Sequence, residues 1–174
     1  MKKSDIVPMP EYFDRYIDLS EDVELSDAFN QSLVQLDKFD SNLLCNIGSL
    51  TYAPGKWTIA ETFQHLIDWE RILTARTLLF ARRELSVQAS IDEKLLGANM
   101  RAEKRSAAEL IEELKIVRRS TIAMFAGFDD EALLTKGTNW IHEMSVLAMG
   151  FNIIGHQLHH FNIIETKYFP LAER

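Results

Sequence analysis

Two histidines near the C-terminal end of the chain, His156 and His160, have a spacing that suits metal binding. Residues four apart project from one face of an α-helix, about 40° apart around its axis and one turn apart along it. Two imidazole nitrogens in this arrangement can bind one divalent cation, which then needs a third ligand from another part of the chain. A second interpretation is a pair of core histidines that hydrogen-bond to carbonyl groups.

His65 is the best candidate for the third ligand. It lies within another helical pattern, on the same general face as Trp69 and Leu73, and a helical bundle brings inward-facing side chains of different helices together. The surroundings of His156 favour the metal interpretation, because the 21 residues 144–164 contain no Asp, Glu, Lys or Arg. Imidazoles without partners would be costly to bury in such a stretch.

The uncharged stretch 144–164 is also long enough to span a bilayer. It carries seven polar side chains, however, which would be expensive in hydrocarbon. We therefore expect a helix of a soluble protein, covered on most sides, and no membrane segment. His159 projects about 60° to the other side of His156 and is expected at a pocket mouth or against a ligand residue. His142, near Trp140, is expected at the surface or as a helix cap.

The elements that must position these histidines follow from hydrophobic periodicity. Apolar residues at three- and four-residue steps predict four long helices, over residues 25–47, 58–83, 106–125 and 142–168. Thr58 with Glu61, and Ser106 with Glu109, have the capping-box spacing that begins a helix. The predicted fold class is all-α, a four-helix bundle with short additional helices at the N-terminus and in the long loops.

The connection over residues 84–105 has a weak pattern, with at most a short helix near 91–100. A connection of this length is unusual in a compact domain. We expect it to cross an end of the bundle or to shape a pocket. A further short turn is expected at 129–131.

The composition suits one acidic globular domain over residues 1–174. The net charge of 19 − 26 = −7 argues against direct nucleic-acid binding, which needs a basic surface. The N-terminus lacks the apolar run of a signal peptide, so the expected location is the cytoplasm. Cys45, the single cysteine, cannot form an intrachain disulfide and is expected to be buried.

Two segments around the histidines resemble the signatures of a known family. YAPGKWTIAE at 52–61, followed by HLIDWER at 65–71, resembles the first signature of the DinB-like superfamily, which is also named for the YfiT proteins. GHQLHH at 155–160 resembles the second signature. The resemblance covers about residues 12–168, which would be the core of the domain.

The resemblance implies a four-helix bundle of the DinB/YfiT type, usually dimeric, that holds a divalent metal. One histidine of the second long helix and two of the last would be the ligands, which are His65, His156 and His160 in this sequence. Nickel and zinc both occur in the family, and imidazole ligands accept either. Three imidazoles leave a coordination position open, which is typical of a catalytic site.

The superfamily includes thiol-dependent S-transferases, so the resemblance implies transfer of a low-molecular-weight thiol to an electrophile. One open alternative is a metal-dependent amide or ester hydrolase. The other is a non-catalytic protein of a stress response that binds a metal or a small ligand. The family takes its name from a DNA damage-inducible gene, which concerns expression and not DNA binding.

Other residues near the predicted site are weaker candidates. Asp68 and Glu61 are possible general bases on the same helix as His65, although capping explains Glu61 and Asp68 could orient a histidine or meet an arginine. Arg76, three turns beyond His65, is expected to form an internal salt bridge or to bind a substrate carboxylate. Trp69 is expected to pack in the core or to line the pocket.

A homodimer is a further expectation. It is motivated by apolar side chains on the side of the last helix opposite His156, namely Phe151, Ile154, Leu158 and Phe161.

Overall fold

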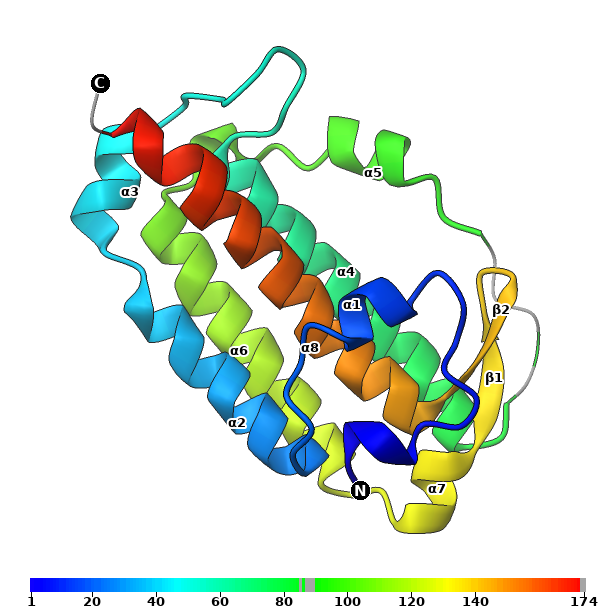
Figure 1. Cartoon of the computed structure of the whole chain (residues 1–174). Helices are drawn as coiled ribbons and strands as arrows, with labels where there is room; N and C mark the ends of the chain where they lie inside the picture. The colour runs from blue at the N-terminus through cyan, green and yellow to red at the C-terminus, as the bar shows by residue number, and fades with distance from the viewer. Residues whose placement is uncertain (85, 87–89, 173–174) are drawn as a thin grey trace.

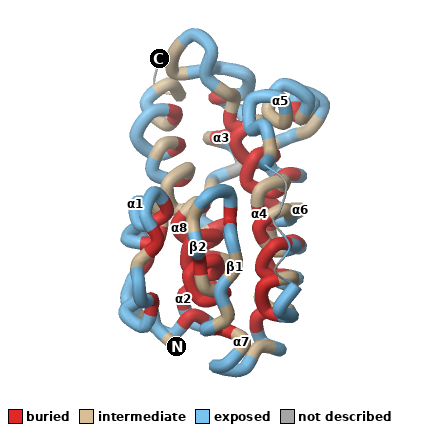
Figure 2. Tube along the Cα trace, turned by 90° about the vertical axis from the view of Figure 1, so that its right-hand side faces the viewer, coloured by how far each residue is buried: buried red, intermediate tan, exposed pale blue. Residues whose placement is uncertain are grey.

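The structure is a computed structural model that describes residues 1–84, 86 and 90–172. Within this part, four long helices pack side by side (Figure 1), which confirms the predicted all-α bundle. Figure 2 shows that buried residues concentrate where these helices face one another. The helices are α2 (Leu25–Gln35), α4 (Ile59–Ala81), α6 (Ala107–Phe125) and α8 (Val146–Ile163).

Helices α4 and α6 are consecutive among the four long helices, and they run parallel. Arg71 pairs with Glu113 at 2.7 Å, and further along both helices the Thr74 and Thr121 hydroxyls are 3.3 Å apart. Two consecutive parallel helices need a connection that returns along the whole bundle. This requirement explains the long segment 82–106, whose described part runs beside the bundle at α5 (Glu93–Ala98) and then passes behind α4 to the start of α6 (Figure 1).

Helix α8 runs antiparallel to α4. His156 contacts His65, whereas Tyr168, beyond the end of α8, donates a hydrogen bond to the carbonyl of Trp57, before the start of α4. Helix α2 contacts α6 and α8, the same two neighbours that α4 has. The long helices α2 and α4 are therefore at diagonally opposite positions in the bundle.

The returning segment contains α5 (Glu93–Ala98) and a 3-10 turn at Ala102–Lys104. Helix α5 lies close to the start of α4, since a Cβ on Gly97 would come within 3.1 Å of the Trp57 ring. A short helix in this region was predicted. Residues 85 and 87–89 of the segment lie outside the described residues.

Both predicted capping boxes are present. The Thr58 hydroxyl accepts a hydrogen bond from the Glu61 amide at 3.2 Å, and the Glu61 carboxylate accepts from the Thr58 amide at 2.7 Å. Ser106 and Glu109 make the same two contacts at 3.2 and 2.8 Å. These contacts satisfy backbone N–H groups that have no partner inside the helix, so α4 and α6 begin at the predicted residues.

The first predicted helix, 25–47, is wrong as one element. After α2 the chain forms a 3-10 turn and then α3 (Ser41–Ile47). Asp40 has extended backbone angles, and its carboxylate accepts from the Asn42 amide at 2.8 Å. An N-cap residue of this kind begins a new helix. Cys45, on α3, is exposed rather than buried as expected.

The start of the last helix is also corrected, because a β-hairpin occupies residues 136–145. Strands β1 (Lys136–Asn139) and β2 (His142–Ser145) pair antiparallel after the short helix α7 (Asp130–Leu134). The Ser145 hydroxyl accepts from the Ala148 amide at 3.1 Å and caps α8. After α8 the chain continues as a π-helical turn, Ile164–Tyr168.

The N-terminal segment packs over α8. A 3-10 turn at Lys3–Asp5 and the short helix α1 (Asp14–Ile17) agree with the short helices expected at this end. Gly155 lets α1 approach, because a Cβ at this position would overlap with the backbone carbonyl of Tyr16. The contact holds residues 12–17 against the helix that carries two of the histidines (Figure 1).

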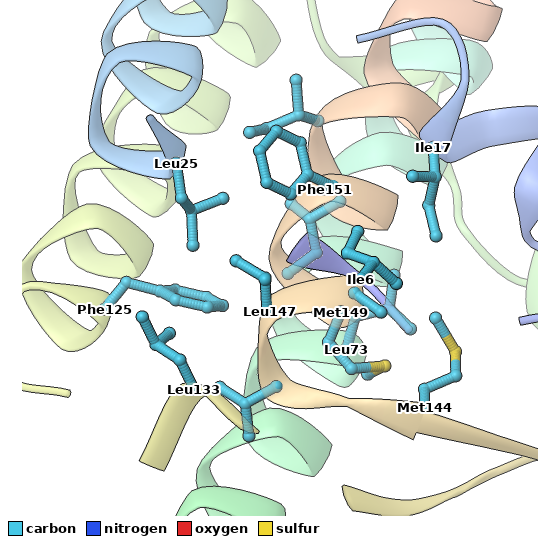
Figure 3. Packing of buried hydrophobic residues seen from close by; sticks show 14 of the residues in the cluster. Ile6, Ile17, Leu25, Leu73, Phe125, Leu133, Met144, Leu147, Met149 and Phe151 are labelled. Carbon is cyan, nitrogen blue, oxygen red and sulfur yellow. The ribbon is translucent and has the colours of Figure 1, made fainter. Parts of the chain in front are cut away.

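The core buries most of the residues that motivated the dimer. Phe151, Ile154 and Phe161 are at most 5% exposed and pack within the chain. Figure 3 shows Phe151 surrounded by apolar side chains from several elements, including Ile17 and Leu25. The homodimer therefore stays a prediction. The apolar residues of α8 that motivated it do not support it, because most of them are buried within the chain. Among the described residues, no helix is long and apolar enough to cross a membrane.

Candidate metal centre

The structure brings His65 of α4 together with His156 and His160 of α8. The Nε2 atom of His156 lies 3.1 Å from Nε2 of His65 and 3.2 Å from Nε2 of His160. One ring nitrogen from each of the three residues lies within 4.8 Å of the others. The antiparallel packing of α4 and α8 places the three side chains at one level of the bundle.

These distances fit three imidazoles that share one cation. Zn–N bonds of about 2.0–2.1 Å place the ligand nitrogens about 2.9–3.4 Å apart, depending on the coordination angle. Hydrogen bonding suits the cluster less well. A neutral imidazole nitrogen has either one hydrogen or one lone pair, so Nε2 of His156 cannot donate to one neighbour and accept from the other. The three histidines are therefore a candidate site for a divalent metal ion.

Burial keeps all three imidazoles in the form that binds metals. It lowers the pKa of His65 to about 4 and the pKa of His160 to about 3, with smaller contributions from neighbouring histidines. The pKa of His156 is lowered well below its ordinary value, first by burial and then by His160 and His65. Metal ligation needs the unprotonated nitrogen, and these imidazoles are neutral at pH 7.

The lowered pKa values predict that the metal-free protein loses stability on acidification. As the pH falls below about 6.5, the unfolded chain takes up protons on these histidines and the folded chain does not. The free energy of unfolding should fall by up to about 1.4 kcal/mol per pH unit for each histidine. This loss continues toward pH 4 for His65 and pH 3 for His160. Urea titrations of chelator-treated protein from pH 7.5 to 5.5 measure it.

The matched control for this titration replaces all three cluster histidines by glutamine. Its free energy of unfolding should vary less between pH 7.5 and 5.5, because the residues with the lowered pKa values are gone. Equal slopes for the control and the metal-free wild type would contradict the assignment.

Aromatic rings enclose the imidazole cluster. The Trp57 ring centroid is 4.6 Å from that of His65, and the Trp69 ring centroid is 6.2 Å from it. Tyr16 places its ring at 5.5 Å from His156 and 5.3 Å from His159, edge-on to both. His159 thus lies beside the cluster but is not part of the converging group. Burial and the Arg15 charge lower the pKa of His159.

The two carboxylate candidates are not among the converging side chains. Asp68 accepts a hydrogen bond from Gln64 at 2.9 Å, and burial raises its pKa. The Glu61 carboxylate is engaged in the helix cap of Thr58. In the part of the chain that the structure describes, the group of possible ligands contains histidines only.

Two cavities formed by described residues reach the cluster, and they have no lining residue in common. The first, of about 280 Å³, reaches His156. The second, of about 340 Å³, reaches His160 and is lined by Lys56, Trp57 and Tyr168 among others. Each cavity is therefore bordered by one histidine of the cluster, His156 in the first and His160 in the second.

Arg76 and Trp69 both line the first cavity. Arg76 donates from Nη1 to Oδ1 of Asn139 at 2.7 Å, and burial lowers its pKa. Tyr16 and Asn139 were not recognised from the sequence. Tyr16 belongs to the N-terminal segment and Asn139 to the hairpin, and neither segment has a motif that indicates a site.

Comparison with known proteins gives one family and one similar structure. The family model of the DinB superfamily matches residues 12–164. YfiT from Bacillus subtilis, described as a probable metal-dependent hydrolase with an unusual four-helix bundle topology, has a similar fold with a TM-score of 0.68. The two sequences are 16% identical, and the similarity covers 93% of this chain and 89% of YfiT. No curated protein matches the chain.

Proposed function

The chain belongs to the DinB superfamily, and from this premise we propose that it is a metal-dependent enzyme with His65, His156 and His160 as ligands. The observation that carries the proposal is the convergence of three imidazoles, two of which, His156 and His160, each border a cavity. A divalent cation on such ligands lowers the pKa of a bound thiol or water and polarises carbonyl groups. Nickel and zinc both suit imidazole ligands.

We propose further that the reaction is transfer of a low-molecular-weight thiol to an electrophile. Two separate cavities, one bordered by His156 and the other by His160, support a reaction of two organic molecules. Among the described residues, the converging group consists of histidines and includes no carboxylate. In the transfer, sulfur forms a bond to the electrophilic carbon, the leaving group departs with its electron pair, and the thiol proton passes to solvent.

Hydrolysis of an amide or ester is the second candidate. It is supported by the similarity to YfiT, which is described as a metal-dependent hydrolase. Asp68, three residues after His65 on α4, is the carboxylate candidate for the base, and burial raises its pKa above the ordinary value. A non-catalytic role in metal or ligand binding is the third. For each of these three functions, we propose that the protein is a cytoplasmic homodimer and does not bind nucleic acid.

The candidates make different predictions for metal removal. The purified protein is analysed for metal and assayed with a panel of thiols and monochlorobimane, before and after treatment with a chelator. Under the transfer proposal, conjugation above the uncatalysed rate should fall more than about 10-fold on chelation and return with Zn²⁺ or Ni²⁺. Chelator-sensitive release of nitrophenol from nitrophenyl esters without thiol would favour hydrolysis instead.

The control is His142→Gln, which removes an imidazole that lies on β2, outside the cluster. It should conjugate bimane like the wild type. A protein that binds no metal, with neither activity, would contradict both enzymatic proposals.

A further inference from the structure

We propose that the first cavity binds a flat aromatic molecule, and that this molecule is the electrophile of the transfer. The role as electrophile rests on the proposed function. Binding of the aromatic molecule depends on the side chains that line the cavity, and not on the metal.

Aromatic side chains from separate parts of the chain line the first cavity. They come from the N-terminal segment, from α4 and from the turn of the β-hairpin, and they are Tyr12, Phe13, Tyr16, Trp69 and Trp140. Aromatic rings bind a planar ring through stacking and edge contacts, in addition to the apolar area that is buried. This set of side chains therefore favours a flat aromatic ligand over a saturated ligand of the same size.

Two of these rings are accessible to a molecule that enters from solvent. Tyr12 is 43% exposed and Trp140 is 45% exposed, and their ring centroids are 5.2 Å apart. Phe13 is only 8% exposed, and its ring centroid is 5.1 Å from that of Tyr12. Covering apolar surface that water contacts is favourable. A ligand in the cavity can thus gain contact area from Tyr12 and Trp140.

The backbone at these two residues has a conformation that large side chains rarely adopt. The φ angle is 69° at Tyr12 and 60° at Trp140, both in the left-handed region. This conformation costs free energy for a bulky residue, and residues held in this way are concentrated at active sites and ligand clamps. Although the two residues are far apart in the sequence, both line the same cavity. Their conformation therefore supports a role in ligand binding.

The same cavity is bordered by the histidine cluster. His156 is a lining residue, and so is Tyr16, whose ring is edge-on to that of His156 at 5.5 Å. The volume of about 280 Å³ is near the lower end of the range for small-molecule sites, about 300–1,000 Å³. This volume suits a ligand of one or two rings. A ligand that fills the cavity contacts both the aromatic side chains and His156.

The charged side chains of the cavity give less reason to select a ligand. The Arg76 guanidinium donates to Oδ1 of Asn139 at 2.7 Å. Glu93 is exposed on α5, where water screens its charge. We therefore expect the aromatic side chains to determine which molecule binds.

The test measures binding of 2-naphthalenemethanol and of its saturated counterpart, decahydro-2-naphthalenemethanol, to chelator-treated protein by isothermal titration calorimetry. The saturated alcohol has a similar size and is no less apolar, so the comparison isolates the contribution of the aromatic ring. We expect saturable binding of the aromatic alcohol and about 5-fold or more weaker binding of the saturated one.

Variants of the lining residues locate the site. Trp140→Leu should weaken binding of the aromatic alcohol by about 5- to 10-fold and change binding of the saturated alcohol less. Trp140→Phe keeps a ring and should stay within about 3-fold of the wild type. Tyr12→Leu is the second variant, in case Trp140→Leu does not fold, and should act in the same direction. Tyr52→Leu is the matched control, because Tyr52 lines the second cavity, and it should bind like the wild type.

Equal affinities for the two alcohols, no binding of either, or equal losses in Trp140→Leu and Tyr52→Leu would overturn the aromatic site. In the metal-loaded protein, the aromatic alcohol should inhibit conjugation competitively with respect to monochlorobimane and not with respect to the thiol. Inhibition that is competitive with the thiol would overturn the assignment to the electrophile. Binding as expected in a protein without conjugation activity would contradict the proposed function alone and support the aromatic site.

Discussion

His156→Ala should lower the affinity for Zn²⁺ or Ni²⁺ by more than about 100-fold. Replacing a residue that only hydrogen-bonds to a metal ligand already lowers metal affinity by about 10- to 100-fold, and replacing the ligand itself should lower it further. His156 is the central member of the cluster. Its Nε2 atom is the one within 3.2 Å of both other Nε2 atoms. Without it, two imidazoles from two different helices are left as ligands. Competition titration with a coloured chelator measures the effect.

His159→Ala is the matched control for this variant. His159 is on the same helix, its ring is 5.1 Å from that of His160, and it is outside the converging group. Its removal should change the affinity by less than about 10-fold. Circular dichroism shows whether each variant keeps its helices. Wild-type affinity in His156→Ala, or the same loss in His159→Ala, would contradict the ligand assignment.

The largest effect on stability is expected for Glu70→Ala. Glu70 and Arg118 form a two-point ion pair at 2.8 and 2.9 Å, with side chains 2% and 1% exposed. Thr121 donates to the same carboxylate at 2.8 Å, and Arg118 also donates to Ser32. The network joins α2, α4 and α6. Glu70→Ala leaves the arginine charge buried without its carboxylate, so the free energy of unfolding should fall by about 3–5 kcal/mol.

Two comparisons separate the charge from packing. Thr121→Val removes hydrogen bonds but no charge, and should cost about 1 kcal/mol. The double variant Glu70→Met/Arg118→Met removes both charges and keeps most of the volume, so it should be clearly more stable than Glu70→Ala. Urea unfolding measures all three. A loss below 1 kcal/mol in Glu70→Ala, or a double variant as unstable as the single one, would contradict this account.

Short sequence patterns were sufficient to predict where the helices that surround the site begin. Thr58 with Glu61 and Ser106 with Glu109 determine where two helices begin, since the capping contacts lie within three residues. Asp40 carries the same kind of signal, and it explains the break between α2 and α3 that periodicity alone missed. The spacing of His156 and His160, and the position of His65 on another helix, were sufficient to nominate the cluster that the structure brings together.

The cavity could not be predicted in the same way, because its walls come from segments that tertiary packing places. Tyr16 reaches the cluster only because Gly155 lets α1 lie on α8, and Asn139 reaches Arg76 only because of the hairpin. The dimer argument failed for a related reason. The spacing of apolar residues along α8 is the same whether another molecule or another part of the same chain covers them. In this structure the N-terminal segment covers part of this face.

X-ray absorption spectroscopy of the zinc-loaded protein tests the central claim most directly. The account predicts one zinc per chain with three imidazole nitrogens at about 2.0–2.1 Å, completed by a light atom from solvent. His156→Ala, loaded in the same way, should lose this three-imidazole signature. A zinc environment of carboxylate and water oxygens, or a three-imidazole signature that persists in His156→Ala, would contradict the assignment of His65, His156 and His160.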